Sequence, residues 1–277
     1  MQLFNFRQKA ARSLPLKTDS LPFIALGARL KNSPLVKTLG FKPNFCDYSK
    51  EEIELMQRAE TIYWPTAFYA ELFNTMGKKT FPSFNNYAFA LDKIKQTAMF
   101  KLLNIPHPRT RIFYGKNQKQ TITDFFKFPF IAKIPRGSSR GRGIFLIKTD
   151  DDLTNYLKIQ GPAYIQEYLP TDRDMRIIVI GNEIALSFWR VAKKGEFRSN
   201  LSQGGEIDFS PLPPEALELA LETAHKCSWN DVGLDLMEYQ GKFMVIEGNM
   251  KYGTSGFKAA GIDYKQMLEN LMVRGKI

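Results

Sequence analysis

Three side chains with metal-binding oxygen atoms lie close together near the end of the chain, within the apolar segment 232–249. A Gln-Gly step in the middle of this segment predicts a tight hairpin turn. Residues whose numbers add up to about 481 or 482 then face each other, which brings Asp235 opposite Ile246 or Glu247. Side chains alternate along a strand, so Asn249 shares the face of Glu247. Two carboxylates and an amide oxygen suit Mg²⁺, and a pair of ordinary solvent-facing strand residues is the alternative.

A basic loop and three arginines are suited to bind phosphate. The loop RGSSRGRG, 136–143, offers backbone N–H and guanidinium groups, and Lys133 precedes it on a strand-like run. A flexible hairpin tip explains this loop equally well. Arg176, Arg190 and Arg198 surround a second predicted hairpin, and the first two interrupt runs of β-branched and aromatic residues. Planar guanidinium groups favour a clamp for a phosphate or acyl phosphate, and arginines on an exposed sheet face are the alternative.

Helices and strands alternate in the first part of the chain. Ser49 and Glu52 predict a capping box at the start of a helix, and a strand at 61–64 and a helix at 67–76 follow. Apolar residues recur at helical spacing over 91–102. The residues of this predicted apolar face are Leu91, Ile94, Ala98, Met99 and Leu102.

The second half of the chain is rich in strand signals. Strand-like runs are expected at 111–114, 130–134, 144–147 and 163–169, with a short helix at 151–158. A hairpin at 176–191, a helix introduced by two prolines at 213–214 and the hairpin that carries Asp235 complete the pattern. The fold class is therefore α/β (α+β), with largely antiparallel sheets in the second half.

Composition and charge limit the class of protein. The 277 residues are 44% apolar and 24% charged, as in folded globular proteins. The net charge of +11 favours a polyanionic partner such as nucleotide phosphate, an acidic peptide, nucleic acid or a membrane surface, and a merely solubilising basic surface is the alternative. No run reaches the roughly 18 apolar residues of a transmembrane helix. The basic segment 1–20 lacks the apolar stretch of a secretory signal, and a transit peptide or a surface-binding arm is the alternative for it.

The cysteines and histidines show no catalytic or metal-binding spacing. Cys46 and Cys227 are far apart, so we expect two small core residues, a reducing compartment and a cytoplasmic protein. His107 and His225 are expected to have packing or surface roles.

The order of several motifs resembles the RimK-like branch of the ATP-grasp carboxylate–amine ligases. The similarity extends over about residues 90–270 and runs through LDKIKQTAMFKLLNIPHPRT, PFIAKIPRGSSRGRG, YIQEYLP, RDMR, GEFRSNLSQGG, DVGLDLM and VIEGNM. A matched series is far more specific than one glycine loop. It implies an ATP-grasp fold, in which two α+β sub-domains grip ATP. The expected domains are a small N-terminal α/β domain with a basic arm over 1–85, a lid sub-domain over 86–165, and a C-terminal metal and nucleotide sub-domain over 166–277.

The resemblance implies roles for individual residues at the nucleotide. Lys93 and Lys133 would contact the ATP phosphates, and the 136–143 loop would close over them. The loop residues expected to bind ATP are Gly137, Ser138, Ser139, Gly141 and Gly143. Glu167 and Tyr168 are expected at the adenine, and Asp174 is expected at the ribose. Ser199 and Asn200 are expected at the rest of the nucleotide.

At the reacting end, the resemblance implies three catalytic arginines and three metal ligands. Arg176 and Arg190 would steady the transferred phosphate and the acyl phosphate, and Arg198 would reach the nucleotide and metal. The implied Mg²⁺ ligands are Asp235, Glu247 and Asn249, which agrees with the hairpin pairing above.

The implied reaction activates a carboxylate as an acyl phosphate and joins it to an amine. Two Mg²⁺ ions, or Mn²⁺ in their place, would lie beside the ATP phosphates. The acceptor could be a small molecule, a peptide or an acidic protein tail, the oligomeric state is open, and no membrane or nucleic-acid partner is expected. Residues 250–253, Met-Lys-Tyr-Gly, depart from the small residues and Pro-Gly step that follow the metal-binding Asn in typical members. Because this segment borders the acceptor in the family, the substrate stays open.

Two other functions remain as alternatives. The first is a phosphotransferase on the same fold, in which the phosphorylated group is the product and no amine attacks. The second is a non-catalytic, basic nucleic-acid-binding module, which the net charge favours. An amine pocket near 250–257 would separate the ligase from the phosphotransferase.

Overall fold

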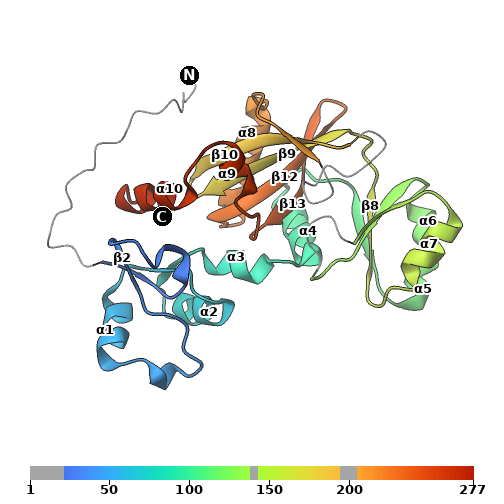
Figure 1. Cartoon of the computed structure of the whole chain (residues 1–277). Helices are drawn as coiled ribbons and strands as arrows, with labels where there is room; N and C mark the ends of the chain where they lie inside the picture. Colours follow the sequence, from blue (N-terminus) through green and yellow to red (C-terminus); the bar gives the residue numbers. More distant parts are fainter. Residues whose placement is uncertain (1–21, 138–142, 194–204) are drawn as a thin grey trace.

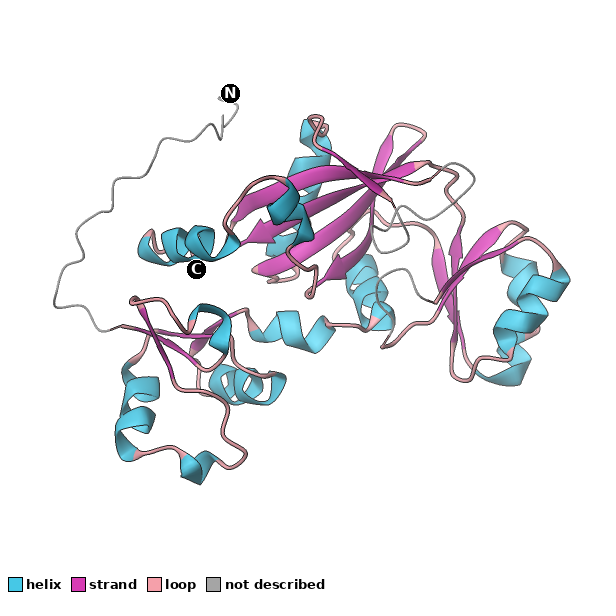
Figure 2. Ribbon diagram, in the orientation of Figure 1, coloured by secondary structure: helices cyan, strands magenta, loops and turns pink. Residues whose placement is uncertain are grey.

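The computed structural model describes residues 22–137, 143–193 and 205–277, which contain three β-sheets (Figure 1). Each sheet is built from one continuous stretch of chain, and helices connect and cover the sheets (Figure 2). None of the helices in the described ranges combines the length and the hydropathy that crossing a bilayer requires. The mixed α/β fold class predicted from the sequence is confirmed.

The first sheet is parallel, with the strand order β2-β1-β3-β4. Its strands are β1 (Phe23–Ala25), β2 (Val36–Thr38), β3 (Thr61–Tyr63) and β4 (Lys79–Phe81). The connections contain the 3-10 helices η1 (Ala28–Leu30) and η2 (Phe45–Asp47) and the helices α1 (Lys50–Arg58) and α2 (Ala67–Thr75). The predicted capping box opens α1: the Ser49 hydroxyl accepts from the Glu52 N–H, and the Glu52 carboxylate accepts from the Ser49 N–H.

The second sheet is antiparallel, with the strand order β5-β8-β6-β7. Its strands are β5 (Thr110–Phe113), β6 (Phe130–Lys133), β7 (Ile144–Ile147) and β8 (Ala163–Glu167). The helices α5 (Gly115–Lys119), α6 (Ile122–Phe125) and α7 (Asp150–Leu157) lie together beside this sheet (Figure 1). An apolar core that includes Phe113, Ile122, Phe130 and Leu153 holds the helices against the strands.

The third sheet is also antiparallel, with the strand order β11-β10-β9-β12-β13. Its strands are β9 (Arg173–Ile180), β10 (Glu183–Val191), β11 (Glu206–Asp208), β12 (Asp231–Tyr239) and β13 (Lys242–Asn249). The helix α8 (Pro214–Lys226) packs on one face through Ala216, Ala220 and Ala224. The last helices are α9 (Ser255–Ala259) and α10 (Tyr264–Val273). Both predicted hairpins, β9-β10 and β12-β13, are confirmed.

Two helices, α3 (Phe84–Phe89) and α4 (Lys93–Leu102), connect the first sheet to the second. Although α4 precedes the second sheet in the sequence, its Phe100 is buried in the core of the third sheet. The first and third sheets also share a core. It joins Tyr63, Trp64 and Phe81 to residues of β9, β10, α9 and α10, including Ile178, Phe188, Phe257 and Leu268.

Two expectations about individual residues are wrong. Leu91 and Leu102 were predicted on the apolar face of the helix now seen as α4, but they are 38% and 77% exposed. The buried residues of α4 are Lys93, Gln96 and Phe100, because the helix packs polar side chains against the end of β13. Cys46 was expected in the core and is exposed, whereas Cys227 is buried as expected.

Candidate active site

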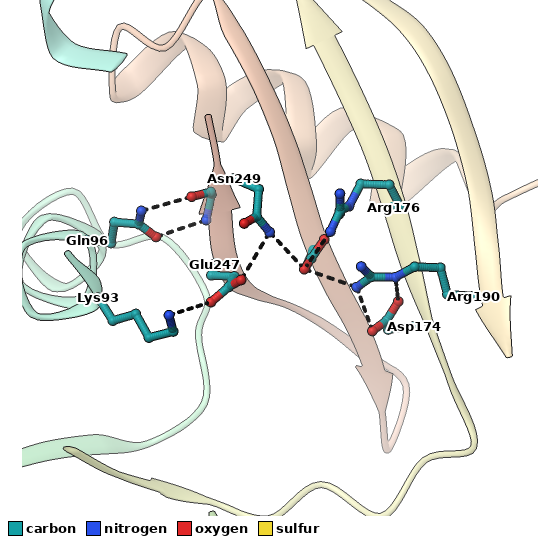
Figure 3. Close-up of polar contacts among 9 residues, drawn as sticks. Lys93, Gln96, Asp174, Arg176, Arg190, Glu247 and Asn249 are labelled. Carbon is teal, nitrogen blue, oxygen red and sulfur yellow. Dashed lines mark hydrogen bonds and ion pairs between the residues drawn. The ribbon is translucent and has the colours of Figure 1, made fainter. Parts of the chain in front are cut away.

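The three oxygen-bearing side chains of the last hairpin converge in the structure, and Figure 3 shows two of them, Glu247 and Asn249, joined by a hydrogen bond. Asp235 on β12 faces Glu247 on β13, and Asn249 is two residues further on the same face. The Asn249 amide nitrogen donates to Asp235 Oδ2 at 3.1 Å and to Glu247 Oε1 at 3.0 Å. Two carboxylates with one amide are fewer donors than a full Mg²⁺ shell, and they fit an ion that also takes water and phosphate oxygens.

A β-bulge decides the register of this hairpin. Asp235 pairs with Glu247, whereas the next residue, Leu236, pairs with Val245. Ile246 is therefore the extra residue of the bulge, and it points the following carboxylate toward Asp235. Of the two pairings that the sequence allowed, the one between Asp235 and Glu247 is confirmed.

Two buried arginines bind the carboxylates of the third sheet. Arg176 donates to both oxygens of Asp235, from Nε at 2.5 Å and from Nη2 at 3.0 Å. Arg190 donates to both oxygens of Asp174, at 2.6 and 2.8 Å, and its Nη2 is 3.0 Å from Asp235 Oδ2. All four residues lie on neighbouring strands in facing or adjacent register. Burial by itself raises the pKa of Asp235, but the two guanidinium groups hold it below its usual value.

Two lysines extend this network toward the second sheet. Lys93, the first residue of α4, has its ammonium 3.4 Å from Glu247 Oε2. Lys133 on β6 is 3% exposed, and its ammonium lies 5.8 Å from the centre of the Tyr164 ring. Burial lowers the pKa of Lys133 to about 8, while Glu247 raises it and Lys93 lowers it. Both cations thus face the carboxylate end of the hairpin, where a phosphate chain would meet them.

A pocket between the second and third sheets ends at these charged groups. Its apolar wall consists of Ile131, Ile144, Leu169, Met237 and Ile246. Its polar end consists of Lys133, Asp174, Arg190, Asp235 and Glu247. An apolar slot with a charged end matches a planar base followed by a phosphate chain.

The nucleotide residues expected from the resemblance divide into two groups. Glu167, Tyr168 and Asp174 line the pocket. Glu167 accepts a hydrogen bond from the Arg109 backbone N–H at 2.6 Å, and Asp174 is bound by Arg190. The residues outside the described ranges are Ser138, Ser139, Gly141, Arg198, Ser199 and Asn200.

The two described ends of the glycine loop are fixed. The Gly137 N–H donates to the Leu91 carbonyl at 3.1 Å, and the Ile134 N–H donates to the Gly143 carbonyl at 2.7 Å. Both glycines have positive φ, and a Cβ on Gly143 would lie 2.9 Å from the Ile134 side chain. Glycine is therefore required at the base of the loop.

Gln96 is a site residue that the sequence analysis did not identify. Its amide donates to the Gly248 carbonyl and accepts from the Gly248 N–H, both at 2.9 Å (Figure 3). Gly248 lies between Glu247 and Asn249 on the edge strand β13, so Gln96 satisfies both outward backbone groups there. A Cβ on Gly248 would lie 2.7 Å from the Trp229 ring. The lone glycine within a strand was the available signal of this close approach.

Replacing Gln96 with leucine is expected to loosen the β12-β13 hairpin, which carries the expected metal ligands. Two buried backbone groups of Gly248 lose their partners, at about 1–3 kcal/mol each. Because the hairpin then holds its ligands less firmly, we expect Mg²⁺ affinity to fall about 10- to 100-fold. Urea unfolding and Mg²⁺ titration measure the two effects. Gln57→Leu, at an exposed position of α1, is the matched control, and equal behaviour of the two variants would contradict a role in positioning.

The two antiparallel sheets with a pocket between them place the fold in the ATP-grasp class. The RimK domain protein ATP-grasp from Sphaerobacter thermophilus superposes with a TM-score of 0.64 at 14% identity, covering 90% of this chain and 98% of that one. The ATP-grasp ligase PsnB, solved with a phosphomimetic variant of a minimal precursor, Mg and ADP, gives 0.58 at 19% identity, with coverage of 82% and 68%.

Sequence comparison defines the family within that class. The RimK-like ATP-grasp domain matches residues 90–271, and the chain belongs to this family. A probable alpha-L-glutamate ligase of Citrobacter koseri is 25% identical over 248 residues, 86% of this chain and 81% of the relative. A ribosomal protein bS6–L-glutamate ligase of Shigella boydii is 24% identical over 246 residues, with the same coverage. The protein is thus an ATP-dependent carboxylate–amine ligase that forms a C–N bond as ATP becomes ADP and phosphate.

Proposed function

We propose that the protein joins an amino acid to a carboxylate through an acyl phosphate, at a site that holds two Mg²⁺ ions on Asp235, Glu247 and Asn249. The observation that carries this proposal is the convergence of these three side chains beside Lys93 and Lys133, at the charged end of the pocket. Mn²⁺ has the same preference for oxygen ligands and would replace Mg²⁺.

The chain's own residues divide the work of phosphoryl transfer. Lys93 and Lys133 bind the phosphate chain from the side of α4 and β6. Arg176 on β9 and Arg190 on β10 offset the charge that develops as the γ-phosphoryl group passes to a carboxylate oxygen. Asp235, Glu247 and Asn249 would hold Mg²⁺, which would supply positive charge at the phosphate oxygens. The amine then attacks the acyl carbon and phosphate leaves, so the residues act mainly by positioning the reactants and excluding water.

The remaining assignments of the nucleotide follow the shape of the pocket. We place the adenine in the apolar slot beside Glu167 and Tyr168, and the ribose next to Asp174. The glycine loop that begins at Gly137 and ends at Gly143 would cover the phosphates. Arg198, with Ser199 and Asn200, completes the proposed set.

The substrates are proposed from the relatives and from charge. Two relatives are named as glutamate ligases, one of them for ribosomal protein bS6, and PsnB was solved with a precursor peptide. We therefore propose an amino acid as the amine and a peptide or protein carboxylate as the acceptor. The net charge of +11 favours an acidic acceptor. Cys46 and Cys227 are free thiols, which agrees with a cytoplasmic protein.

The test is an ADP-release screen of the full chain with Mg²⁺ and ATP. Each of the twenty L-amino acids is incubated with a set of acidic and neutral peptides, and the products are identified by mass spectrometry. An ATP-dependent amide product supports the proposal. A phosphorylated product that forms without amine would favour a phosphotransferase. Absence of amine-dependent ADP release with every pair would contradict the proposed ligation of an amino acid.

The binding of ATP is expected to take up protons at alkaline pH. Since the pKa of Lys133 is lowered to about 8 and a bound phosphate raises it again, the complex holds more protons than the free protein above about pH 8. ATP affinity therefore falls as the pH rises beyond that value. Calorimetry with a non-hydrolysable ATP analogue, in buffers of different ionisation enthalpy, measures this uptake. Lys133→Arg stays charged, so equal uptake by this variant at about pH 8.5 would assign the proton to another group.

A further inference from the structure

A cluster of charged and aromatic side chains lies at the carboxyl end of the parallel first sheet, outside the nucleotide pocket. All strands of this sheet are parallel, but β2 lies on one side of β1 and β3 on the other, so the order of the connections reverses between β1 and β3. In open α/β sheets, ligands bind outside the carboxyl ends of the strands at such a point. Arg29 follows β1 and Trp64 follows β3. The two loops touch, because a Cβ on Gly27 would lie 2.7 Å from the Trp64 carbonyl oxygen.

Arg29 is held in place but keeps part of its guanidinium available. The guanidinium carbon lies 5.9 Å from the centre of the Trp64 ring and 5.7 Å from that of Tyr264. Nη1 donates to the Tyr264 hydroxyl at 2.6 Å and is 3.7 Å from Asp231 Oδ2. Within the described ranges, the hydrogen bonds of this side chain involve Nη1 alone, so Nε and Nη2 have no partner there. The side chain is 41% exposed.

The same strand joins this cluster to the metal ligands. Asp231 and Asp235 lie on one face of β12, four residues or about 13 Å apart. Gly233, between them, leaves room for Tyr252: a Cβ there would lie 2.7 Å from Tyr252 Cβ and 3.3 Å from Arg176 Cδ. The Tyr252 hydroxyl donates to Asp231 Oδ1 at 2.5 Å. Tyr252 therefore packs on β12 over Gly233, between Asp231 and Asp235.

The order of Met237, Asp235 and Asp231 along β12 indicates which reactant lies on the side of Arg29. Met237 lines the nucleotide pocket, Asp235 is in the metal set, and Asp231 beside Arg29 lies on the opposite side of that set. Because the pocket lies on one side of the metal set, the side of Arg29 is the one left for a third reactant.

The burial of the Asp231 carboxylate is explained by the two side chains that it orients. Its side chain is 2% exposed, and burial raises its pKa to about 6, while Arg29 and Tyr252 lower it. Burying a charge is unfavourable unless it is paired, and such groups concentrate at functional sites. Here the carboxylate orients Arg29 and Tyr252 together. Tyr252 belongs to the segment 250–253 that departs from the family pattern.

We propose that Arg29 is a specificity-determining residue that binds the α-carboxylate of the amino acid whose amine reacts at the metal site. A guanidinium with a free Nε and Nη2 edge matches a carboxylate with two parallel hydrogen bonds. Trp64 and Tyr264 set the plane of the guanidinium, and Asp231 with Tyr252 fixes its position. The proposal rests on the proposed function, because it assigns the amine substrate of the same reaction.

The test compares Arg29→Met and Arg29→Lys with the wild-type full chain. The probes are the L-amino acids and their α-carboxamides, which carry the same amine. For Arg29→Met we expect the KM of the amino acid to rise about 10- to 100-fold, the KM of ATP to stay within about twofold, and the preference for carboxylate over carboxamide to disappear. Arg29→Lys is expected to lie between. Arg58→Met, at an exposed position of the same domain, is the control.

A second readout separates binding from turnover. Calorimetry of the amino acid, with Mg²⁺ and a non-hydrolysable ATP analogue present, is expected to show the same loss of affinity in Arg29→Met. Unchanged affinity in both variants, or an equal loss for acid and carboxamide, would overturn the role of Arg29 while leaving the ligase intact. Absence of amine-dependent turnover in the wild type, by contrast, would overturn the proposed function and this inference together.

Discussion

Replacing Glu247 with glutamine is expected to remove nearly all Mg²⁺-dependent ligase activity. The substitution keeps the shape of the side chain but removes the charge that faces the Lys93 ammonium at 3.4 Å and that belongs to the proposed metal set with Asp235 and Asn249. Because Lys93 and the proposed Mg²⁺ site both lose a partner, we expect kcat/KM to fall at least about 100-fold. Steady-state kinetics across a range of Mg²⁺ concentrations measures the effect.

Glu238→Gln is the matched control for this substitution. Glu238 lies on the same hairpin and is exposed. We expect this variant to keep wild-type kinetics, since a solvated carboxylate there has no partner in the site. Retention of more than about a tenth of the wild-type kcat/KM in Glu247→Gln would contradict the assignment of Glu247 as a metal ligand.

Replacing Arg190 with methionine is expected to destabilise the fold as well as to abolish activity. Arg190 is 4% exposed and binds Asp174 and Asp235, whose side chains are 8% and 6% exposed. Its removal leaves buried carboxylate charge without its main counter-ion, which typically reduces the free energy of unfolding by about 3–5 kcal/mol. Urea unfolding monitored by circular dichroism measures this loss.

Two further variants separate charge from packing at this position. Arg173→Met, an exposed neighbour on β9 that stacks on Trp189 at 4.6 Å, is expected to lose no more than about 1 kcal/mol. Adding Asp174→Asn to Arg190→Met should recover part of the lost stability, because one unpaired charge disappears. A stability of Arg190→Met within about 1 kcal/mol of the wild type would show that the buried carboxylates do not depend on this guanidinium.

The pairing of the β12-β13 hairpin could be predicted because its signals are local. A two-residue turn and the alternation of side chains fix which residues share a face. The final choice of Glu247 over Ile246 depends on a bulge, and a bulge reflects contacts from outside the hairpin. Those contacts come from Gln96 and Trp229, which are distant in sequence, so the turn alone could not specify the register.

The arginines and α4 show where sequence patterns were insufficient. Arg176 and Asp235 are 59 residues apart, and nothing local indicates that they are neighbours on adjacent strands. In α4, helical periodicity predicted an apolar buried face, whereas the helix buries Lys93 and Gln96 because the edge of β13 requires polar partners. The three-residue strands β1, β2 and β4 were too short to give a clear alternation.

The hydrogen bonds between Gln96 and Gly248 join α4 and β13, so we expect the helix and the strand to move together. Lys93 is on α4, whereas Lys133 belongs to the sheet on the other side of the pocket. A hinge between the two sheets would therefore leave one ammonium stationary and carry the other toward or away from it. The distance between Lys93 and Lys133 would therefore change as the two sheets close on the nucleotide. Spectroscopic labels placed on α4 and β6 would measure that distance.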